Sequence, residues 1–328
     1  MRNIVDRRDF LRKSFQLCAT AGALAATATP GSPTFAQTQT NNVRRPDRYD
    51  EGLFILDRKR FTWPGGKTLA VWLIPNVEVF VLNPSAGTPG AGIGENVLNY
   101  SWREYGMRVG LLRLADAMDS VGAKGTVALN AGVCEIFPKA IDEMKKRGWE
   151  MMGHGLTNSQ GLRGMNPDQE RTLIHTTLQI IERAMGKPVR GWLGTGLQET
   201  FTTLDTLAEA GVRYTGDWNN DDLPYRMKVK TGEMYSLPYG NQINDITFFG
   251  RGHTGEEHYQ LLVDHFDTLY ADSQKLPRIM GIPLHPFHTG QALNAKSFQR
   301  ALQYFKEREG VWFATGSEIL EAYKKVEA

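Results

Sequence analysis

The sequence predicts an α/β barrel in which parallel strands alternate with outer helices. Short runs of aliphatic and aromatic residues, bounded by Gly, Pro or Asn, recur between longer stretches of helical periodicity. Repeated strand–helix alternation is typical of a parallel sheet with its helices outside. Seven or eight strands in a chain of this length favour a barrel over an open sheet, and no internal repeat or second domain is evident.

The strands are predicted from their short apolar runs and the turn residues that bound them. They are 68–74, 125–130, 149–153, 189–193, 212–217, 235–239, 278–284 and 311–314.

The helices have clearer start and stop signals. Asn166 followed by Pro167 predicts an N-cap and a first helical turn, and the apolar residues after them share one face. Asn294 is predicted to cap a later helix that Gly310 stops. Further helices are predicted over 108–120, 137–147, 202–210 and 256–273.

The N-terminal segment has the features of an export signal. Arg7-Arg8-Asp9-Phe10-Leu11 has a twin-arginine pattern, and Thr34-Phe35-Ala36 offers a cleavage site of small residues. The apolar stretch between them is too short to span a bilayer. We expect a twin-arginine export signal over 1–36, an extended arm over 37–60 and one barrel domain over 61–328. The twin-arginine export machinery would then carry the folded protein to the periplasm or out of the cell; a disordered basic tail is the alternative.

Composition excludes some classes of function. The net charge is only +2, and Lys and Arg do not cluster after residue 36, so no nucleic-acid partner is expected. After cleavage one cysteine would remain, Cys134, so an intrachain disulfide is impossible, and we expect Cys134 to be a small buried apolar residue. The oligomeric state cannot be predicted from these features.

Three ionisable residues follow three predicted strands. Glu78 comes shortly after 68–74, His154 directly after 149–153, and His285 directly after 278–284. In an α/β barrel the carboxyl ends of the strands meet at one rim, where catalytic residues gather. The sequence therefore predicts an active site built from these three side chains.

The motifs around these residues resemble the polysaccharide deacetylase family, which has the NodB homology fold. The resemblance runs from about Phe61 to Tyr323 and follows the order of the five family blocks: Pro75-Asn76-Val77-Glu78, His154-Gly155-Leu156-Thr157-Asn158, Arg190-Gly191-Trp192-Leu193-Gly194-Thr195-Gly196, Asp217-Trp218 and Pro283-Leu284-His285. It implies a distorted (β/α)7–8 barrel of NodB type in a single domain, and hydrolysis of amide bonds.

Two positions depart from the family pattern. Asn76 stands where a second acid is expected, and Asn158 stands where the second metal-binding histidine is expected. The resemblance implies a divalent, zinc-type metal held by Glu78, His154 and Asn158, but an amide oxygen is a weak third ligand. No cofactor is therefore certain, and a metal stays one of two alternatives.

The same departures indicate a branch of the family. Glu104-Tyr105-Gly106-Met107-Arg108 and the segment 217–225 resemble the metal-independent allantoinases and cyclic-imide hydrolases. Residues expected to bind the substrate are Asn76, Glu104, Arg108, Trp192, Asp217, Trp218, Asp222 and His288. An exposed ion pair is the alternative for Glu104 and Arg108, and core packing for the two tryptophans.

The expected reaction is the attack of water on a planar amide carbonyl. Glu78 would take the proton from water and His285 would protonate the leaving nitrogen, while His154 would bind a metal or polarise the carbonyl. An N-acetylated glycan or a related amide is the first candidate substrate. A small cyclic amide of allantoin or imide type is the second, with the loop 83–94 as a lid or a plain surface loop. A carbohydrate-binding protein that has lost catalysis is the rival, because Asn76 and Asn158 are what such a loss would leave.

Overall fold

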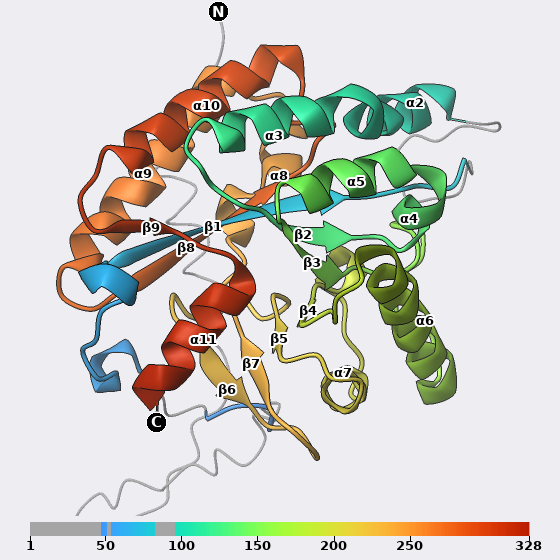
Figure 1. The fold of residues 1–328 in the computed structure, drawn as a ribbon, viewed down its shortest axis with the longest axis horizontal. Helices are drawn as coiled ribbons and strands as arrows, with labels where there is room; N and C mark the ends of the chain where they lie inside the picture. The colour runs from blue at the N-terminus through green and yellow to red at the C-terminus, as the bar shows by residue number, and fades with distance from the viewer. Residues whose placement is uncertain (1–46, 51–53, 83–95, 328) are drawn as a thin grey trace, which may run out of the picture. The chain divides into compact units, whose positions relative to one another are not determined.

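The computed structural model describes residues 47–50, 54–82 and 96–327 (Figure 1). The predicted export signal over 1–36 and the loop 83–94 lie outside the described residues. Of the predicted arm, Tyr49 forms an isolated antiparallel bridge with Met227, and the Arg58 side chain forms an ion pair with Asp221 at 2.7 Å. The described parts of the arm therefore pack against the domain.

A single curled sheet forms the centre of the described domain. Its nine strands are β1 (Leu69–Val77), β2 (Thr126–Leu129), β3 (Glu150–Gly153), β4 (Gly191–Trp192), β5 (Tyr214–Thr215), β6 (Tyr225–Met227), β7 (Met234–Ser236), β8 (Arg278–Leu284) and β9 (Val311–Phe313). Their order is β6-β7-β5-β4-β3-β2-β1-β8, and β9 also pairs with β1. All pairs are parallel except β6 with β7. This arrangement confirms the predicted distorted barrel.

The two ends of the sheet approach each other without forming a regular ladder. Gly281 of β8 lies so close to the chain after β7 that an added Cβ would be 2.3 Å from the carbonyl oxygen of Pro238. The N–H of Ile279 also donates to the carbonyl of Asp222 at 3.1 Å. Glycine is needed at 281 because any side chain would hold the two backbones apart.

Helices cover the outside of the sheet. They are α2 (Val97–Tyr105), α3 (Leu111–Asp119), α4 (Gly132–Ile136), α5 (Pro138–Lys146), α6 (Pro167–Met185), α7 (Thr203–Glu209), α8 (Asp245–Phe249), α9 (Gly255–Ser273), α10 (Ala292–Lys306) and α11 (Gly316–Glu327). Figure 1 shows α3 and α10 side by side along one side of the sheet, with α6 and α7 farther along. Within the described residues, no helix combines the length and the apolar character needed to cross a membrane.

Alternate residues of β1 enter two separate cores. Leu69, Val71 and Leu73 pack with buried side chains of the outer helices, such as Phe298 of α10. Ala70, Trp72 and Ile74 pack in a second cluster with Tyr214, Tyr235 and Leu237, which fills the barrel interior. Because successive strand residues point to opposite faces, a run that is apolar at every position is buried on both sides.

The helix signals were right in one place and wrong in another. Asn166 caps α6 as predicted, and it forms a capping box with Gln169. Asn294 does not cap α10, which begins at Ala292 after Gln291. The buried Asn294 side chain instead donates to the carbonyl of His288 at 3.0 Å. Asn294 thus fixes the loop that carries His285 and His288.

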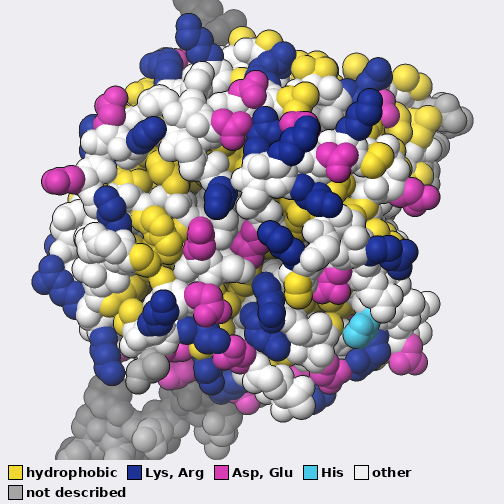
Figure 2. Space-filling model, viewed as in Figure 1, with side chains coloured by type: hydrophobic (Ala, Val, Ile, Leu, Met, Phe, Trp, Pro, Cys, Tyr) yellow, Lys and Arg dark blue, Asp and Glu magenta, His cyan; other side chains and the backbone are white. Residues whose placement is uncertain are grey.

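The surface is mixed in charge. On the face drawn in Figure 2, basic and acidic side chains are interspersed over all parts of the molecule that can be seen. This face therefore has no large patch of one sign of the kind that nucleic acids need.

Candidate active site

The structure brings the three predicted residues together at the carboxyl ends of β1, β3 and β8. Nε2 of His154 lies 3.3 Å from Oε1 of Glu78, and Nε2 of His285 lies 3.7 Å from the same oxygen. All three side chains are at most 5% exposed. One carboxylate oxygen therefore faces two imidazoles inside a largely dry site.

His285 is oriented by a residue that the sequence analysis missed. Its Nδ1 lies 2.6 Å from Oδ1 of Asp245, and its backbone N–H donates to Oδ2 of the same carboxylate at 2.7 Å. Thr289 also donates its hydroxyl to Asp245. Asp245 is completely buried at the start of α8, so these three contacts fix the position of its carboxylate.

The charges around His285 favour its protonated form. Burial alone would lower the pKa of His285, but the carboxylates of Asp245 and Glu78 outweigh burial and raise its pKa above its ordinary value. Burial would likewise raise the pKa of Asp245, but the neighbouring His285 holds it below the ordinary range. The pair therefore favours a protonated imidazole beside an ionised carboxylate.

His154 is fixed on both sides. Its Nδ1 lies 2.6 Å from the carbonyl oxygen of Leu193, and since a carbonyl can only accept, this nitrogen carries a hydrogen. Its Nε2 is thereby directed at Glu78. The buried side chain of Asn130, at the end of β2, donates to the carbonyl of His154 and accepts from the N–H of Val79 at 3.0 Å. Asn130 thus ties the strand end of Glu78 to that of His154.

The second oxygen of Glu78 is free to react. Oε2 is buried and has no hydrogen-bond partner among the described residues. A buried carboxylate oxygen without a partner is costly, so such groups are usually completed by water or a ligand. This oxygen is where a water molecule or a substrate would accept or donate a hydrogen bond.

Both polar atoms of the Asn76 side chain are hydrogen-bonded to residues outside the trio. Its Nδ2 donates to the carbonyl of Ile74 at 3.1 Å, and its Oδ1 accepts from the hydroxyl of Tyr239 at 3.3 Å. Asn244 donates in turn to the Tyr239 hydroxyl at 3.4 Å. Burial raises the pKa of Tyr239 well above its ordinary value, so Tyr239 remains a neutral donor. The residue that replaces the second family acid is therefore part of a neutral hydrogen-bond network.

The side chains present are a poor match for a metal. Among the residues that the structure describes, no group of three or more His, Cys, Asp or Glu side chains is placed to hold an ion. Asn158 does have a buried Oδ1 without a partner among the described residues, but an amide is a weak ligand. His285 would have to lose its proton to bind a metal, whereas its carboxylate neighbours favour the protonated form. No step of the mechanism below therefore depends on a metal.

Arg103 contributes a cation that the sequence analysis did not select. Its guanidinium lies over the ring of Phe80 at 4.1 Å and 5.6 Å from the centroid of Phe287, and Nε donates to Asn99 at 2.8 Å. Burial lowers the pKa of Arg103, while the charge of Glu78 raises it. The guanidinium therefore lies within electrostatic reach of Glu78.

A π-turn places Arg103. Residues Gly106–Gly110 form one turn of π-helix between α2 and α3. Gly106 and Gly110 pack against the loop after β8, and an added Cβ would lie 2.7 Å from the N of Phe287 and 2.0 Å from the O of Pro286. Such turns are frequent at functional sites. The motif 104–108 therefore seats the His285 loop against α2 instead of offering its own charges.

Some predicted substrate-binding residues lie away from the trio. Arg108 is 71% exposed and forms a long, 4.0 Å pair with Glu104, which was the alternative prediction for both. Trp192 is 1% exposed and packs against Gly153 in the outer core, as in the alternative prediction for it. Asp222 is exposed and pairs with Arg278 at the start of β8, the opposite end of that strand from His285.

The remaining predicted residues lie nearer. His288 is buried beside His285, with ring centroids 6.5 Å apart, and burial lowers its pKa to about 4. Asp217 follows β5, where its Oδ1 accepts from the N–H of Gly194 at 2.7 Å. Trp218 donates through Nε1 to Glu199 at 3.0 Å.

Asp217 and Glu199 form a buried acid pair behind His154. Each has an oxygen that is buried without a partner among the described residues outside the pair. Burial raises the pKa of Asp217 to about 6, and burial and the charge of Asp217 raise that of Glu199 well above its ordinary value. A shared proton explains how two acids lie together here. The pair holds Gly194, the neighbour of the Leu193 carbonyl that orients His154.

Cys134 has no place in this site. It is a free, partly buried thiol packed against the outer core, and burial raises its pKa to about 11. A thiol this hard to deprotonate is a poor nucleophile precursor.

Comparison with known proteins finds similar sequences and folds. The family model for polysaccharide deacetylases matches residues 105–215. A Schizosaccharomyces pombe protein that carries polysaccharide deacetylase in its name is 26% identical over 239 residues, 67% of this chain and 74% of its own length.

Solved structures are similar over most of the domain. A structure from Pseudomonas aeruginosa PAO1, also named as a polysaccharide deacetylase, has a TM-score of 0.73 at 26% identity and covers 80% of this chain and 93% of its own. PuuE allantoinase has a TM-score of 0.72 at 26% identity, and the match covers 80% of this chain and 92% of the allantoinase. A Mycobacterium smegmatis structure has a TM-score of 0.72 at 22% identity, and the match covers 82% of this chain and 95% of that structure. At this identity the match supports the fold alone. The chain is therefore similar in sequence to the polysaccharide deacetylase model over 105–215, and similar in fold to a polysaccharide deacetylase and an allantoinase over most of the described domain.

Proposed function

We propose that the protein is a hydrolase of non-peptide carbon–nitrogen bonds in which Glu78 is the base and His285 is the general acid. One observation carries the proposal: a buried carboxylate with a free oxygen lies 3.7 Å from an imidazole that a second carboxylate orients and whose pKa it raises. A base and an acid are thus present together, on adjacent strands.

The proposed reaction begins with a water molecule at the free oxygen of Glu78. Glu78 takes one proton as the water oxygen bonds to the amide carbonyl carbon, which leaves a tetrahedral intermediate with a negatively charged oxygen. Arg103 stabilises that charge. His285 then gives its proton to the nitrogen, the carbon–nitrogen bond breaks, and the proton held by Glu78 returns His285 to its charged form through water.

The identity of the amide divides the proposal into two forms. An N-acetylated sugar is the first, supported by the relatives named as polysaccharide deacetylases. Ring opening of a small cyclic amide is the second, and two observations favour it: the similarity to an allantoinase and a donor set that lacks three strong metal ligands. A glycan-binding protein without catalysis is the third candidate, but such a protein would not need an ordered Asp245–His285 pair.

Site-directed variants test this assignment. Glu78→Gln keeps the shape of the side chain but cannot take a proton, so turnover should fall by about 10²–10⁴-fold. Acetate or ring-opened product would be measured over a panel of acetylated glycans and cyclic amides. Glu150→Gln is the control, because Glu150 is a partly buried glutamate at the opposite end of β3 from His154. If Glu78→Gln retained most of the wild-type turnover, the assignment of the base would be wrong.

We also propose that the protein is exported to the periplasm or the cell exterior by the twin-arginine machinery. The support is the Arg7-Arg8 pattern and the small residues at 34–36. Cell fractionation of the wild type and of an Arg7→Lys, Arg8→Lys double variant tests this. Retention of both proteins in the cytoplasm would contradict the proposal.

A further inference from the structure

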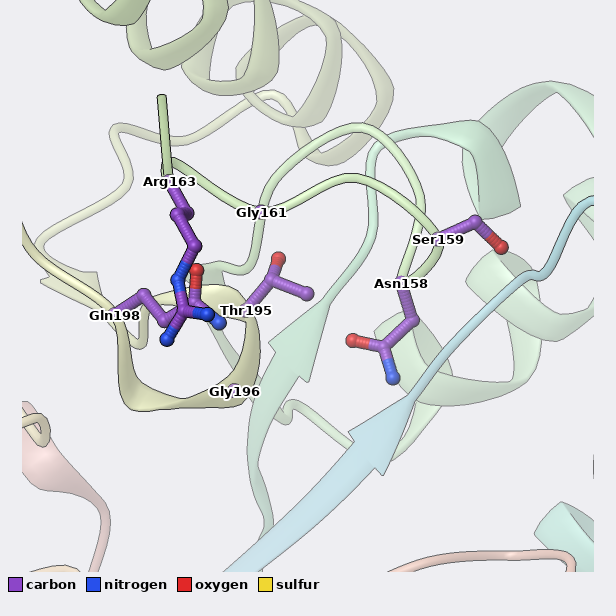
Figure 3. Close-up of a pocket in the computed structure, with 7 residues that line it drawn as sticks. All are labelled: Asn158, Ser159, Gly161, Arg163, Thr195, Gly196 and Gln198. Atoms are coloured by element: carbon purple, nitrogen blue, oxygen red, sulfur yellow. The ribbon is translucent and has the colours of Figure 1, made fainter. Parts of the chain in front are cut away.

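A cavity of about 350 Å³ lies beside the catalytic trio, between the loops that follow β3 and β4. Figure 3 shows Asn158 and Arg163 from the first loop and Thr195 and Gln198 from the second. The N–H of Asn158 donates to the carbonyl of Val79, the neighbour of Glu78, at 2.9 Å. Thr195 donates its hydroxyl to the carbonyl of His154 at 3.1 Å. The walls of the cavity are thus bonded directly to the residues that flank the proposed chemistry.

Arg163 gives this cavity its charge. It is the one ionisable residue among those that line the cavity; the others are glycines and neutral polar side chains. Figure 3 shows its guanidinium extending over the turn Thr195–Leu197 towards Gln198. Within the described part of the chain, Arg163 has no ion pair or hydrogen-bonded side chain, whereas Arg171 on α6 is paired with Glu209 at 2.7 Å. Arg163 is exposed at the open side of the cavity, so its unpaired guanidinium is available to bind an anion there.

Two amide groups in the same walls also lack partners. Oδ1 of Asn158 and Oε1 of Gln198 are buried, and neither has a hydrogen-bond partner among the described residues. Buried amide oxygens of this kind are normally completed by water or a ligand. Each amide presents an acceptor and, after rotation of the group, a donor, so it can bind an N–H or a C=O of a substrate.

The backbone is shaped to keep the cavity open. An added Cβ at Gly161 would lie 2.7 Å from Oε1 of Gln198, and one at Gly155 would lie 2.9 Å from the hydroxyl of Thr195. Leu197, on the turn under the cavity, has φ of 55°, a conformation that leucine rarely adopts. Strain of this type is kept where the surrounding structure fixes a functional shape.

We propose that the cavity is a subsite for a carboxylate on the substrate: Arg163 binds the carboxylate, and Asn158 and Gln198 bind the polar groups between it and the scissile amide. The inference rests on the proposed function, because it places the scissile carbonyl at Glu78. It narrows the substrate class from amides in general to amides that carry a carboxylate a few bonds from the carbonyl. A neutral N-acetyl sugar or a neutral ring would leave Arg163 unused.

Matched substrate pairs test the subsite. N-acetylmuramic acid and N-acetylglucosamine differ by one carboxylate arm, and so do dihydroorotate and dihydrouracil among cyclic amides. In at least one pair, the carboxylate member should have the higher kcat/KM. Arg163→Gln should raise its KM by about 10–100-fold, the effect of one charge-assisted hydrogen bond, and bring the kcat/KM ratio of the pair close to one. Arg163→Lys should restore part of the ratio, and Arg171→Gln, the control on α6, should leave it unchanged.

Binding separates the subsite from the chemistry. Calorimetry with the Glu78→Gln variant measures the affinity for the same four compounds without turnover. Carboxylate-dependent binding that needs Arg163, with no hydrolysis by the wild type, would support the subsite and contradict the proposed function. Hydrolysis of neutral amides that is insensitive to Arg163→Gln would support the proposed function and contradict the subsite. The subsite would be refuted if neither carboxylate compound bound better than its neutral partner, or if Arg163→Gln weakened both members equally.

Discussion

Replacement of Asp245 by Asn tests the acid half of the mechanism most directly. In the wild type, Oδ1 of Asp245 accepts from Nδ1 of His285 at 2.6 Å, and its other oxygen accepts from a backbone N–H and a hydroxyl. An asparagine has the same shape but only one acceptor oxygen, so one of these donors must face an N–H group. We expect the imidazole to lose both its charge partner and its fixed orientation.

The replacement should reduce both the rate of turnover and the stability of the fold. A positioned general acid contributes about 10²–10⁴-fold to the rate, which corresponds to about 2.7–5.4 kcal/mol of the barrier. Asp245→Asn should therefore lower kcat by a factor in that range while the fold is retained. Loss of a buried hydrogen bond to a charged group should also cost about 1.5–3 kcal/mol of unfolding free energy, which thermal denaturation would measure.

The pH profile distinguishes an acid from a merely structural residue. The carboxylates raise the pKa of His285 above 6.5, and the alkaline limb of kcat/KM reports that pKa in the free enzyme. Without the Asp245 charge, burial dominates and the pKa falls, so the alkaline limb should move to lower pH. Asp205→Asn is the control, because Asp205 is a buried aspartate on α7 that pairs with Lys230 and lies outside the site. If Asp245→Asn left both kcat and the alkaline limb at their wild-type positions, His285 would not be the acid.

Four further outcomes follow from the site. Turnover should survive prolonged treatment with a strong chelator, with no stoichiometric metal found by elemental analysis; loss of activity that zinc restores would contradict the metal-independent mechanism. Arg103→Gln should lower kcat/KM by about 10–100-fold, the contribution of one charge-assisted hydrogen bond, and a change below threefold would remove Arg103 from the mechanism. The raised pKa of Asp217 means that the unfolding free energy falls as pH rises from 3.8 through about 6, so Asp217→Asn should flatten this fall in urea denaturation, and an unchanged slope would refute the shared proton. Asn76→Asp should lower the melting temperature at neutral pH, since it buries a new carboxylate, and equal melting temperatures would show that a second acid is tolerated.

The sequence was sufficient where one local pattern determines an element. The run 278–284 is apolar after Arg278 and bounded by turn residues, and β8 spans the same residues. The strands β4 and β5 are only two residues long, although 189–193 and 212–217 were predicted, because pairing with neighbours decides where a ladder ends. The strand β6 was missed because it is only three residues long and pairs antiparallel with β7, outside the strand–helix alternation on which the prediction rested.

Some residues of the candidate site could be predicted from local sequence patterns and others could not. Glu78, His154 and His285 were found because each follows a recognisable strand and parallel strands present their carboxyl ends together. Asp245 begins a five-residue helix forty positions before His285, and no local pattern connects the two. Arg103 was missed because the motif that resembles the allantoinases begins one residue later, at Glu104, and Arg108 of that motif lies in the π-helical turn Gly106–Gly110.

The exchange of the second family acid for Asn76 fits the balance of charge in the site. The carboxylates of Glu78 and Asp245 face a protonated His285 and the guanidinium of Arg103, so two negative charges meet two positive ones. Buried charges are tolerated only when they are paired in this way. A carboxylate at position 76 would add one unpaired negative charge, and a divalent cation is the usual means of offsetting it. With an amide at 76, held by Tyr239 and the Ile74 carbonyl, the site is neutral from its own side chains. With Asn76 in place of the acid, no cation is needed to balance the charge of the site, and this fits the incomplete set of metal ligands.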